Sequence, residues 1–324
     1  MEDIDRLIEN SLNGEKRSTA RLISLVERGD DTAPYILEKI YPRSGSAFYI
    51  GVTGTPGVGK STMVDRLVRL FCRNDYSVGV IAVDPGSPFS GGAFLGDRIR
   101  MTPRDENGDV FFRSMSAGRV MGGLASTTKA VSRILDASGK QIIIIETVGV
   151  GQSELDITQA TDTVLVVLMP EAGDSMQILK AGLMEISDIL VVNKSDLPNS
   201  ENISSSIRRM LENSPRNVQW QPPVLLTSAS LNKGIDALYA AIWRHYHFLQ
   251  KDLGRETRRK LQLKAELLQE IQAGFAEALS KNLFLEKNIN RLVEDVWEQK
   301  TAPRTVAQRI LKEWLVKQGP HDTS

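Results

Sequence analysis

Residues that can hold phosphate occur together near position 60. A run of apolar residues from Phe48 is followed by Gly54, four further residues, and then Gly59, Lys60 and Ser61. This GxxxxGK[ST] spacing is typical of a phosphate-binding loop, because glycines let backbone N–H groups turn toward phosphate oxygens. The lysine can reach the terminal phosphates, and the serine hydroxyl can bind Mg²⁺ at a helix N-terminus whose dipole favours negative charge. A glycine-rich turn with an accidental lysine is the alternative, but strand, loop and helix follow in the order that the motif requires. The residues predicted to bind nucleotide here are Gly54, Thr55, Pro56, Gly57, Val58, Gly59, Lys60, Ser61 and Thr62.

A second motif lies far downstream, where the apolar run from Ile189 to Val192 leads into NKSD. The carboxylate of Asp196 can accept hydrogen bonds from the ring imino and exocyclic amino groups of guanine, a donor pair that adenine lacks. With adenine, a buried charged acceptor would stay unpaired, which costs on the order of several kcal/mol. A TSA segment after another apolar run fits a loop that offers backbone N–H to the guanine carbonyl. Either motif can occur by chance, but beside the phosphate loop they predict GTP and GDP as ligands. The predicted base-contacting residues are Asn193, Lys194, Asp196, Ser228 and Ala229.

Three further acidic positions are candidate Mg²⁺ ligands. Asp84 follows an apolar strand, although a carboxylate there can also cap a turn or helix. Asp97 ends a glycine-rich stretch that can order around a γ-phosphate, with a surface salt bridge as its alternative role. Glu146 occupies the Walker-B position, and Gly149 can offer its N–H to the γ-phosphate. Gln152 can orient the attacking water, or it can be an ordinary surface glutamine. The predicted catalytic set is Lys60, Glu146, Gly149 and Gln152.

Composition limits the classes of function. The chain has 324 residues, of which 41% are hydrophobic and 25% charged, and its formal net charge is +0. No overall electrostatic attraction to nucleic acid or acidic lipid is therefore expected. The single cysteine, Cys72, rules out an internal disulfide framework and suits a reducing compartment. No secretory signal or Arg-rich transit peptide is expected, because the N-terminus, from Met1 to Asp5, is acidic and has no continuous apolar region. No membrane span is expected, because no run of about 18 apolar residues occurs. We therefore expect a cytoplasmic protein.

Seven short apolar runs alternate with helix-length segments. Continuous Val, Ile and Leu runs of this kind predict an α/β fold: a mostly parallel sheet of about seven strands, with helices on both faces and ligands at the carboxyl ends of the strands. We expect three parts, namely an N-terminal helical extension over 1–46, a P-loop GTPase domain over 47–250, and a C-terminal helical arm over 251–324. The apolar stripe of the arm fits internal packing or a homodimer face. The pair His245 and His247 is a poor metal site, because positions i and i+2 of a helix point apart.

Several segments, in order, closely resemble the MeaB/ArgK (MMAA-type) family of P-loop GTPases. These are VTGTPGVGKST, VDPGSPFSGGAFLGDRIRM, ETVGVGQSE, PEAGDSMQILKAGLMEISDI and VVNKSD, and the likeness covers nearly the whole chain. The resemblance implies Mg²⁺ contacts at Ser61, Asp84, Asp97 and Glu146. It also implies a homodimer and a mobile loop with Asp174, Gln177 and Lys180 as its polar members, although Asp174 can equally be a helix N-cap.

The same resemblance implies a biological role. Members of the family are chaperones of adenosylcobalamin-dependent acyl-CoA mutases, chiefly methylmalonyl-CoA mutase, and couple GTP hydrolysis to cofactor loading and mutase protection. An adenosyltransferase is a possible further partner. Two departures bear on partner contacts: the segment Ser114–Gly123 lacks the histidine that usually precedes the paired glycines, and Gly86 stands where serine is commoner. The alternatives are a kinase of a transport-system protein and a membrane-targeting GTPase.

Overall fold

The computed structural model describes residues 2–84, 109–116, 125–147, 156–170, 183–212, 219–251, 254–280 and 283–317. By their contacts the residues form two compact units, Met1–Glu266 and Leu267–Ser324. The predicted division at positions 46 and 250 stays a prediction.

A seven-stranded parallel sheet forms the centre of the first unit. Its strand order is β3-β2-β4-β1-β5-β6-β7, so the phosphate-loop strand β1 is central. Every pairing between these strands is parallel. The α/β fold predicted from the apolar runs is confirmed. The strands are β1 (Phe48–Thr53), β2 (Val78–Asp84), β3 (Val110–Ser116), β4 (Ile142–Thr147), β5 (Thr163–Leu168), β6 (Ile189–Val192) and β7 (Val224–Leu226).

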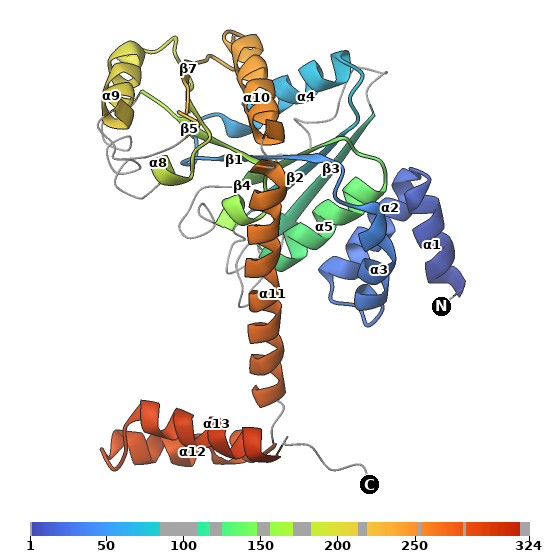
Figure 1. Ribbon diagram of the computed structural model, residues 1–324, viewed down its shortest axis with the longest axis vertical. Coiled ribbons are helices and arrows are strands. Elements are labelled where there is room, and N and C mark those ends of the chain that lie inside the picture. The colour runs from blue at the N-terminus through green and yellow to red at the C-terminus, as the bar shows by residue number, and fades with distance from the viewer. Residues whose placement is uncertain are drawn as a thin grey trace. The chain divides into compact units, whose positions relative to one another are not determined.

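Successive side chains of the central strands enter opposite cores, because a strand alternates its faces with a period of two. In β4, Ile142 and Ile144 pack into the core that contains residues of α4 (Lys60–Arg73) and α10 (Ile235–Gln250). Ile143 and Ile145 pack into the other large core, with α5 (Ala125–Ala137). The helices thus cover both faces of the sheet (Figure 1). This burial fixes the strands whose carboxyl ends carry the predicted loops.

The N-terminal helices belong to the same body as the sheet. They are α1 (Glu2–Leu12), α2 (Lys16–Glu27) and α3 (Ala33–Ile40), followed by the 3₁₀ turn η1 (Tyr41–Arg43). Leu22 and Ile23 of α2 are fully buried in the core that also contains Ile134 of α5. A third, smaller core lies under β5, β6 and β7. The elements around it are η2 (Ile157–Gln159), α8 (Leu183–Ile186) and α9 (Ser200–Glu212).

Ion pairs hold the first turns of α11 (Gly254–Ser280) against the sheet. Arg258 pairs with Asp188 at 3.0 Å, and Arg259 pairs with Asp162 at 2.7 Å. The two aspartates directly precede β6 and β5, so the helix is bound at the amino ends of strands whose carboxyl ends carry the predicted nucleotide loops. Burial would raise the pKa of Asp162, but the hydrogen bonds and charge of Arg259 lower it overall and keep this carboxylate ionised.

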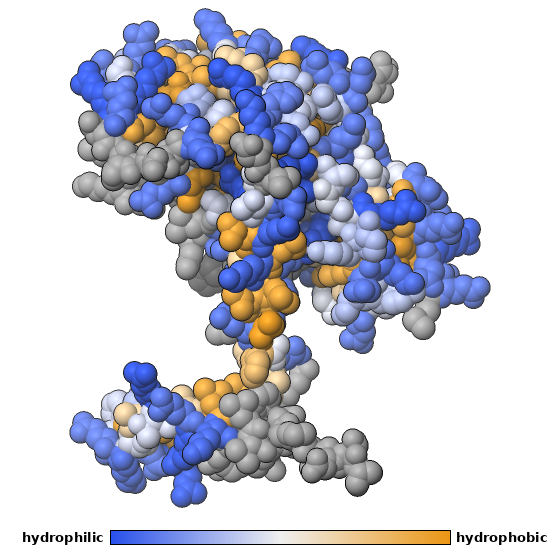
Figure 2. Space-filling model, in the orientation of Figure 1, coloured by the Kyte–Doolittle hydropathy of each residue, from blue (hydrophilic) through white to orange (hydrophobic). Residues whose placement is uncertain are grey.

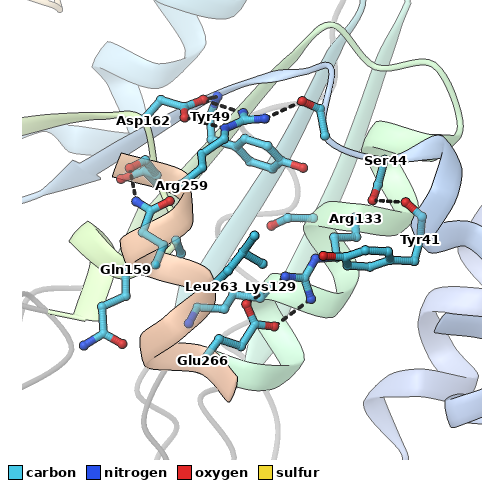
Figure 3. Close-up of a pocket in the computed structure, with 15 residues that line it drawn as sticks. Tyr41, Ser44, Tyr49, Lys129, Arg133, Gln159, Asp162, Arg259, Leu263 and Glu266 are labelled. Carbon is cyan, nitrogen blue, oxygen red and sulfur yellow. Dashed lines mark hydrogen bonds and ion pairs between the residues drawn. The ribbon is translucent and has the colours of Figure 1, made fainter. Parts of the chain in front are cut away.

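A cavity of about 190 Å³ lies beside this contact, at the amino edge of the sheet. Figure 3 shows Tyr49 and Arg259 at one end of it and the ion pair of Arg133 with Glu266 at the other. The guanidinium of Arg259 lies 5.1 Å from the centre of the Tyr49 ring. The nucleotide loops follow the carboxyl ends of the strands, so this cavity is separate from the predicted site.

The second unit contains the rest of α11 together with α12 (Leu283–Trp297) and α13 (Pro303–Lys317). Apolar side chains of α11 are exposed along its length: Leu261 is 64% exposed, Leu267 62% and Leu268 51%. Figure 2 shows this apolar surface in orange over α11. Among the described residues, no helix is both long and apolar enough to cross a bilayer.

Candidate nucleotide-binding site

The predicted phosphate loop joins β1 to α4, and its glycines adopt conformations that other residues avoid. Gly54, Gly57 and Gly59 have φ values of 143°, 79° and 92°. A Cβ at Gly54 would lie 2.1 Å from the carbonyl oxygen of Val167, so no side chain fits there. These positive φ angles let the loop turn its amides inward, which is the geometry that a phosphate cradle requires.

Lys60, the first residue of α4, extends back over this loop. Its Nζ donates to the carbonyl oxygens of Gly54 and Thr55 at 2.7 and 2.9 Å, and the residue is 6% exposed. The Thr55 hydroxyl is buried, and no hydrogen-bond partner is found for it among the described residues. A buried hydroxyl usually has a partner, so this loop fits a polyanion whose oxygens can accept from it.

Ser61 and Glu146 are brought together on the predicted metal side of the loop. The Ser61 hydroxyl donates to Glu146 Oε1 at 2.6 Å, and Glu146 is 4% exposed at the end of β4. Next to this pair, the Thr147 hydroxyl donates to that of Thr53 at 3.0 Å and joins the ends of β4 and β1. Hydroxyl and carboxylate oxygens are the ligands that Mg²⁺ prefers, so the pair fits this ion.

The other predicted metal ligands are less completely described. β2 ends at Asp84, and because Val83 lies opposite Thr147 in the parallel register, the Asp84 backbone lies at the same edge of the sheet. Asp97 is outside the described residues. Within the described part of the chain, no group of three or more His, Cys, Asp or Glu side chains could hold a metal ion. The Mg²⁺ site therefore stays a prediction.

Asn193 connects the phosphate loop to the predicted base-reading loops. It follows β6 and is 2% exposed. Its Nδ2 donates to the carbonyl oxygen of Val58 in the phosphate loop at 2.7 Å. Its Oδ1 accepts from the Thr227 hydroxyl at 3.1 Å and from the Ala229 amide at 3.0 Å. One buried amide thus fixes the two ends of the candidate site relative to each other.

Asp196 is exposed at the mouth of the site, where a base could reach it. The hydroxyl of Ser228 donates to its Oδ1 at 2.5 Å. This hydrogen bond lowers the pKa of Asp196, so the carboxylate stays ionised and can accept from guanine. Lys194 has a φ of 56° and places its Nζ 3.7 Å from the sulfur of Met169, at the end of β5.

Several predicted residues lie outside the described part of the chain, namely Asp97, Gly149, Gln152, Asp174, Gln177 and Lys180. Conversely, the sequence did not point to two contacts at the site: the Thr53–Thr147 pair, and Arg66 of α4, whose guanidinium reaches the carbonyls of Ala229 and Ser230. Both contacts join residues far apart in the chain, and no local motif marks such partners.

With this geometry in place, comparison with known proteins identifies the family. The profile of the family described as "Methylmalonyl Co-A mutase-associated GTPase MeaB" matches residues 19–283, which include every loop described above. The chain belongs to the MeaB family. The MeaB match confirms the resemblance drawn from the motifs.

Relatives of this MeaB-family chain include proteins named as GTPases. One from Pyrococcus abyssi is 43% identical over 316 residues, which is 96% of each chain. The GTPase ArgK of Escherichia coli is 37% identical over 238 residues, 71% of this chain and 72% of ArgK. The "Methylmalonic aciduria type A homolog, mitochondrial" of Mus musculus is 27% identical over 327 residues, 95% of this chain and 79% of that protein. The present MeaB-family protein is accordingly a GTPase.

A solved structure shares the fold of this MeaB-family chain. The crystal structure titled LAO/AO transport system kinase superimposes with a TM-score of 0.75 at 26% identity and covers 96% of this chain and 97% of that one.

Proposed function

We propose that this protein is a Mg²⁺-dependent GTPase that acts as a molecular switch for an adenosylcobalamin-dependent acyl-CoA mutase, with methylmalonyl-CoA mutase as the leading candidate. The observation that carries the proposal is the match of the MeaB family, described as mutase-associated, over residues 19–283. The geometry of Asn193 supports the nucleotide half of the proposal, because it joins the phosphate loop to the loops that would read guanine.

In this proposal each end of the nucleotide has its own residues. The glycine amides and Lys60 bind the phosphates, while Asp196 accepts from the guanine ring with Lys194 and the Ser228–Ala229 loop around the base. Ser61, Asp84, Asp97 and Glu146 would hold Mg²⁺, which when bound neutralises charge on the β- and γ-phosphates. Water attacks the γ-phosphorus and the bond to the β-phosphate oxygen breaks, which releases GDP and phosphate.

Conformational change would follow from loss of the γ-phosphate. We assign Gly149 to the γ-phosphate contact and Gln152 to the attacking water, so hydrolysis would release this segment. Asp174, Gln177 and Lys180 are the proposed contacts that carry the change to the mutase. An adenosyltransferase is a proposed further member of the complex, and the proposed location is the cytoplasm.

The proposed assembly is a homodimer through the C-terminal arm, residues 251–324, with 1–46 and 47–250 as the other two parts. Exposed leucines of α11 support this proposal. Leu261 and Leu267 are 64% and 62% exposed. Exposed apolar surface of this kind commonly marks an interaction site, and a second copy is a partner that could cover it.

The mutase proposal is tested with purified methylmalonyl-CoA mutase. We expect size-exclusion chromatography to show a complex whose stability differs between GDP and a non-hydrolysable GTP analogue. We also expect adenosylcobalamin loading of the apo-mutase to require GTP. Lys60→Ala is the control, because a variant without the proposed phosphate-binding lysine should lose nucleotide-dependent loading. Its unfolding midpoint is measured to check that the fold is kept. The proposal would be contradicted if no complex formed with either nucleotide and if adenosylcobalamin loading proceeded equally well without GTP.

A second candidate function comes from the solved structure titled LAO/AO transport system kinase, because this chain matches 97% of its length. A kinase would transfer the γ-phosphate to a protein or small molecule instead of water. Incubation with γ-labelled GTP and candidate acceptors separates the two. Label released as inorganic phosphate supports the GTPase switch, and label that stays on an acceptor supports the kinase.

A further inference from the structure

The loop after β7 is folded back on itself. Ser228 and Lys233 form an antiparallel bridge in which each amide donates to the other's carbonyl at 3.0 Å. Asn232 and Gly234 have φ values of 55° and 73°, and a Cβ at Gly234 would lie 2.3 Å from the carbonyl oxygen of Leu226. The loop is therefore closed at its base, and the buried Ala229 and the exposed Ser230 begin the outer part between the two bridge residues.

An arginine of the phosphate-loop helix holds this outer part. Arg66 Nε donates to the carbonyl oxygen of Ala229 at 3.1 Å, and its terminal Nη2 donates to that of Ser230 at 3.3 Å. Arg66 lies in α4, which begins at Lys60. A guanidinium presents donors in a fixed plane, so it can hold two successive carbonyls at once, whereas a lysine ammonium is a single point charge.

These contacts orient three successive peptide planes. The Ala229 amide is held by Asn193 Oδ1, and the next two carbonyls are held by Arg66. A trans peptide is planar, with its C=O and N–H on opposite sides, so a fixed carbonyl also fixes the direction of the N–H in the same plane. Asn193 and Arg66 together therefore decide where the amides of this loop point.

We propose that Arg66 is a positioning residue for guanine recognition: by holding two loop carbonyls it sets the amides of Ser230 and Leu231, which read the 6-oxo group of the base. The inference rests on the proposed guanine site. Asp196 would read the imino and 2-amino groups independently, because its partner Ser228 is fixed by the bridge to Lys233 and not by Arg66. Loss of Arg66 should therefore weaken recognition at the 6 position more than at the 2 position.

Nucleotide analogues separate these two positions. In 6-thio-GTP, sulfur, a weak acceptor, replaces only the 6-oxo oxygen, and ITP lacks only the 2-amino group. We expect the wild type to prefer GTP over 6-thio-GTP by about five- to tenfold, which corresponds to the loss of one buried hydrogen bond. Arg66→Ala should bind GTP about five- to tenfold more weakly, with its GTP to 6-thio-GTP ratio reduced to about two. Its GTP to ITP ratio should stay within about twofold of the wild-type ratio.

The matched control is Arg69→Ala, one turn further along α4. Arg69 forms an ion pair within the helix, with Asp65 at 3.0 Å. The variant Arg69→Ala should keep both the GTP to 6-thio-GTP ratio and the GTP to ITP ratio of the wild type. Arg66→Lys should recover part of the lost preference for the 6-oxo group, because a lysine can donate to one of the two carbonyls. Thermal unfolding of each variant checks that the fold is kept, and Arg66→Gln replaces Arg66→Ala if the alanine variant does not fold.

Three results would overturn the inference: an unchanged 6-thio-GTP ratio in Arg66→Ala, an equal fall of both ratios, or the same fall in Arg69→Ala. Failure of the proposed function is a different result, because then the wild type itself would show no preference for GTP over ATP.

Discussion

A pair of glycines in the phosphate loop offers a sharp test of how the site is assembled. Both Gly57 and Gly59 have positive φ, 79° and 92°. A Cβ at Gly57 would meet nothing within 4 Å, whereas one at Gly59 would lie 2.5 Å from Nδ2 of Asn193. The variants Gly57→Ala and Gly59→Ala therefore share a conformational cost and differ in one contact.

The magnitude follows from that contact. A left-handed conformation costs an alanine about 1–2 kcal/mol, and this applies to both variants. At Gly59 the Asn193 amide must also move, which disturbs its hydrogen bonds to Val58, Thr227 and Ala229. Each buried hydrogen bond contributes about 1 kcal/mol, so we expect Gly59→Ala to be about 1–3 kcal/mol less stable than Gly57→Ala.

Urea unfolding of the nucleotide-free variants measures this difference without any contribution from phosphate contacts. GDP titration should then show binding about five- to a hundredfold weaker in Gly59→Ala than in Gly57→Ala. Equal stability and equal GDP affinity of the two variants would refute the proposal that Asn193 couples the phosphate loop to the base-reading loops.

Three other predictions concern single side chains. Burial lowers the pKa of His245 from 6.5 to about 4. Its contribution to stability is therefore complete above about pH 6.5 and is lost as the pH falls toward 4. Up to about 3 kcal/mol should disappear over that range, and His245→Gln should flatten the pH dependence of urea unfolding. A wild type equally stable at pH 7 and pH 4.5 would contradict this. Lys60→Ala should nearly abolish phosphate release from GTP, and wild-type turnover in that variant would remove the lysine from its assigned role. Asp196→Asn should shift preference from GTP toward XTP, because an amide donates where the carboxylate accepts; unchanged discrimination in a binding titration would count against guanine reading by Asp196.

The sheet could be predicted from the sequence because its strands carry their own signal. Runs such as Ile142–Ile145 are continuous apolar segments, as strands buried on both faces must be, and each predicted run is a strand in the structure. The phosphate loop and NKxD were recognisable for a related reason: glycine, lysine and carboxylate positions in a short loop are constrained locally by the ligand they would hold.

Contacts between distant segments could not be predicted in this way. Asn193 was expected to hold a loop, but its bond to Val58 depends on how β6 and β1 lie in the sheet. No local motif marks Arg66, because its partners lie 163 and 164 residues further along the sequence. Spacing in the sequence shows which residues share a helix face, but only the fold shows which residues that face contacts.

The C-terminal arm illustrates the same limit. Its apolar stripe suggested internal packing or a homodimer face, and the sequence could not choose between them. In the structure the first turns of α11 bind the sheet through Arg258 and Arg259, while Leu261 and Leu267 of the same helix are exposed. Charged side chains thus form the contact between α11 and the sheet. The periodicity of the apolar residues does not predict which charged residues form it.

Titration calorimetry of the wild-type protein with Mg²⁺ and either guanine or adenine nucleotides tests the central claim most directly. If Lys60 and the glycine loop bind phosphate while Asp196 reads guanine, GTP and GDP should bind at one site per chain, and ATP should bind at least about a hundredfold more weakly. No heat with either guanine nucleotide, or tighter binding of ATP than of GTP, would contradict it.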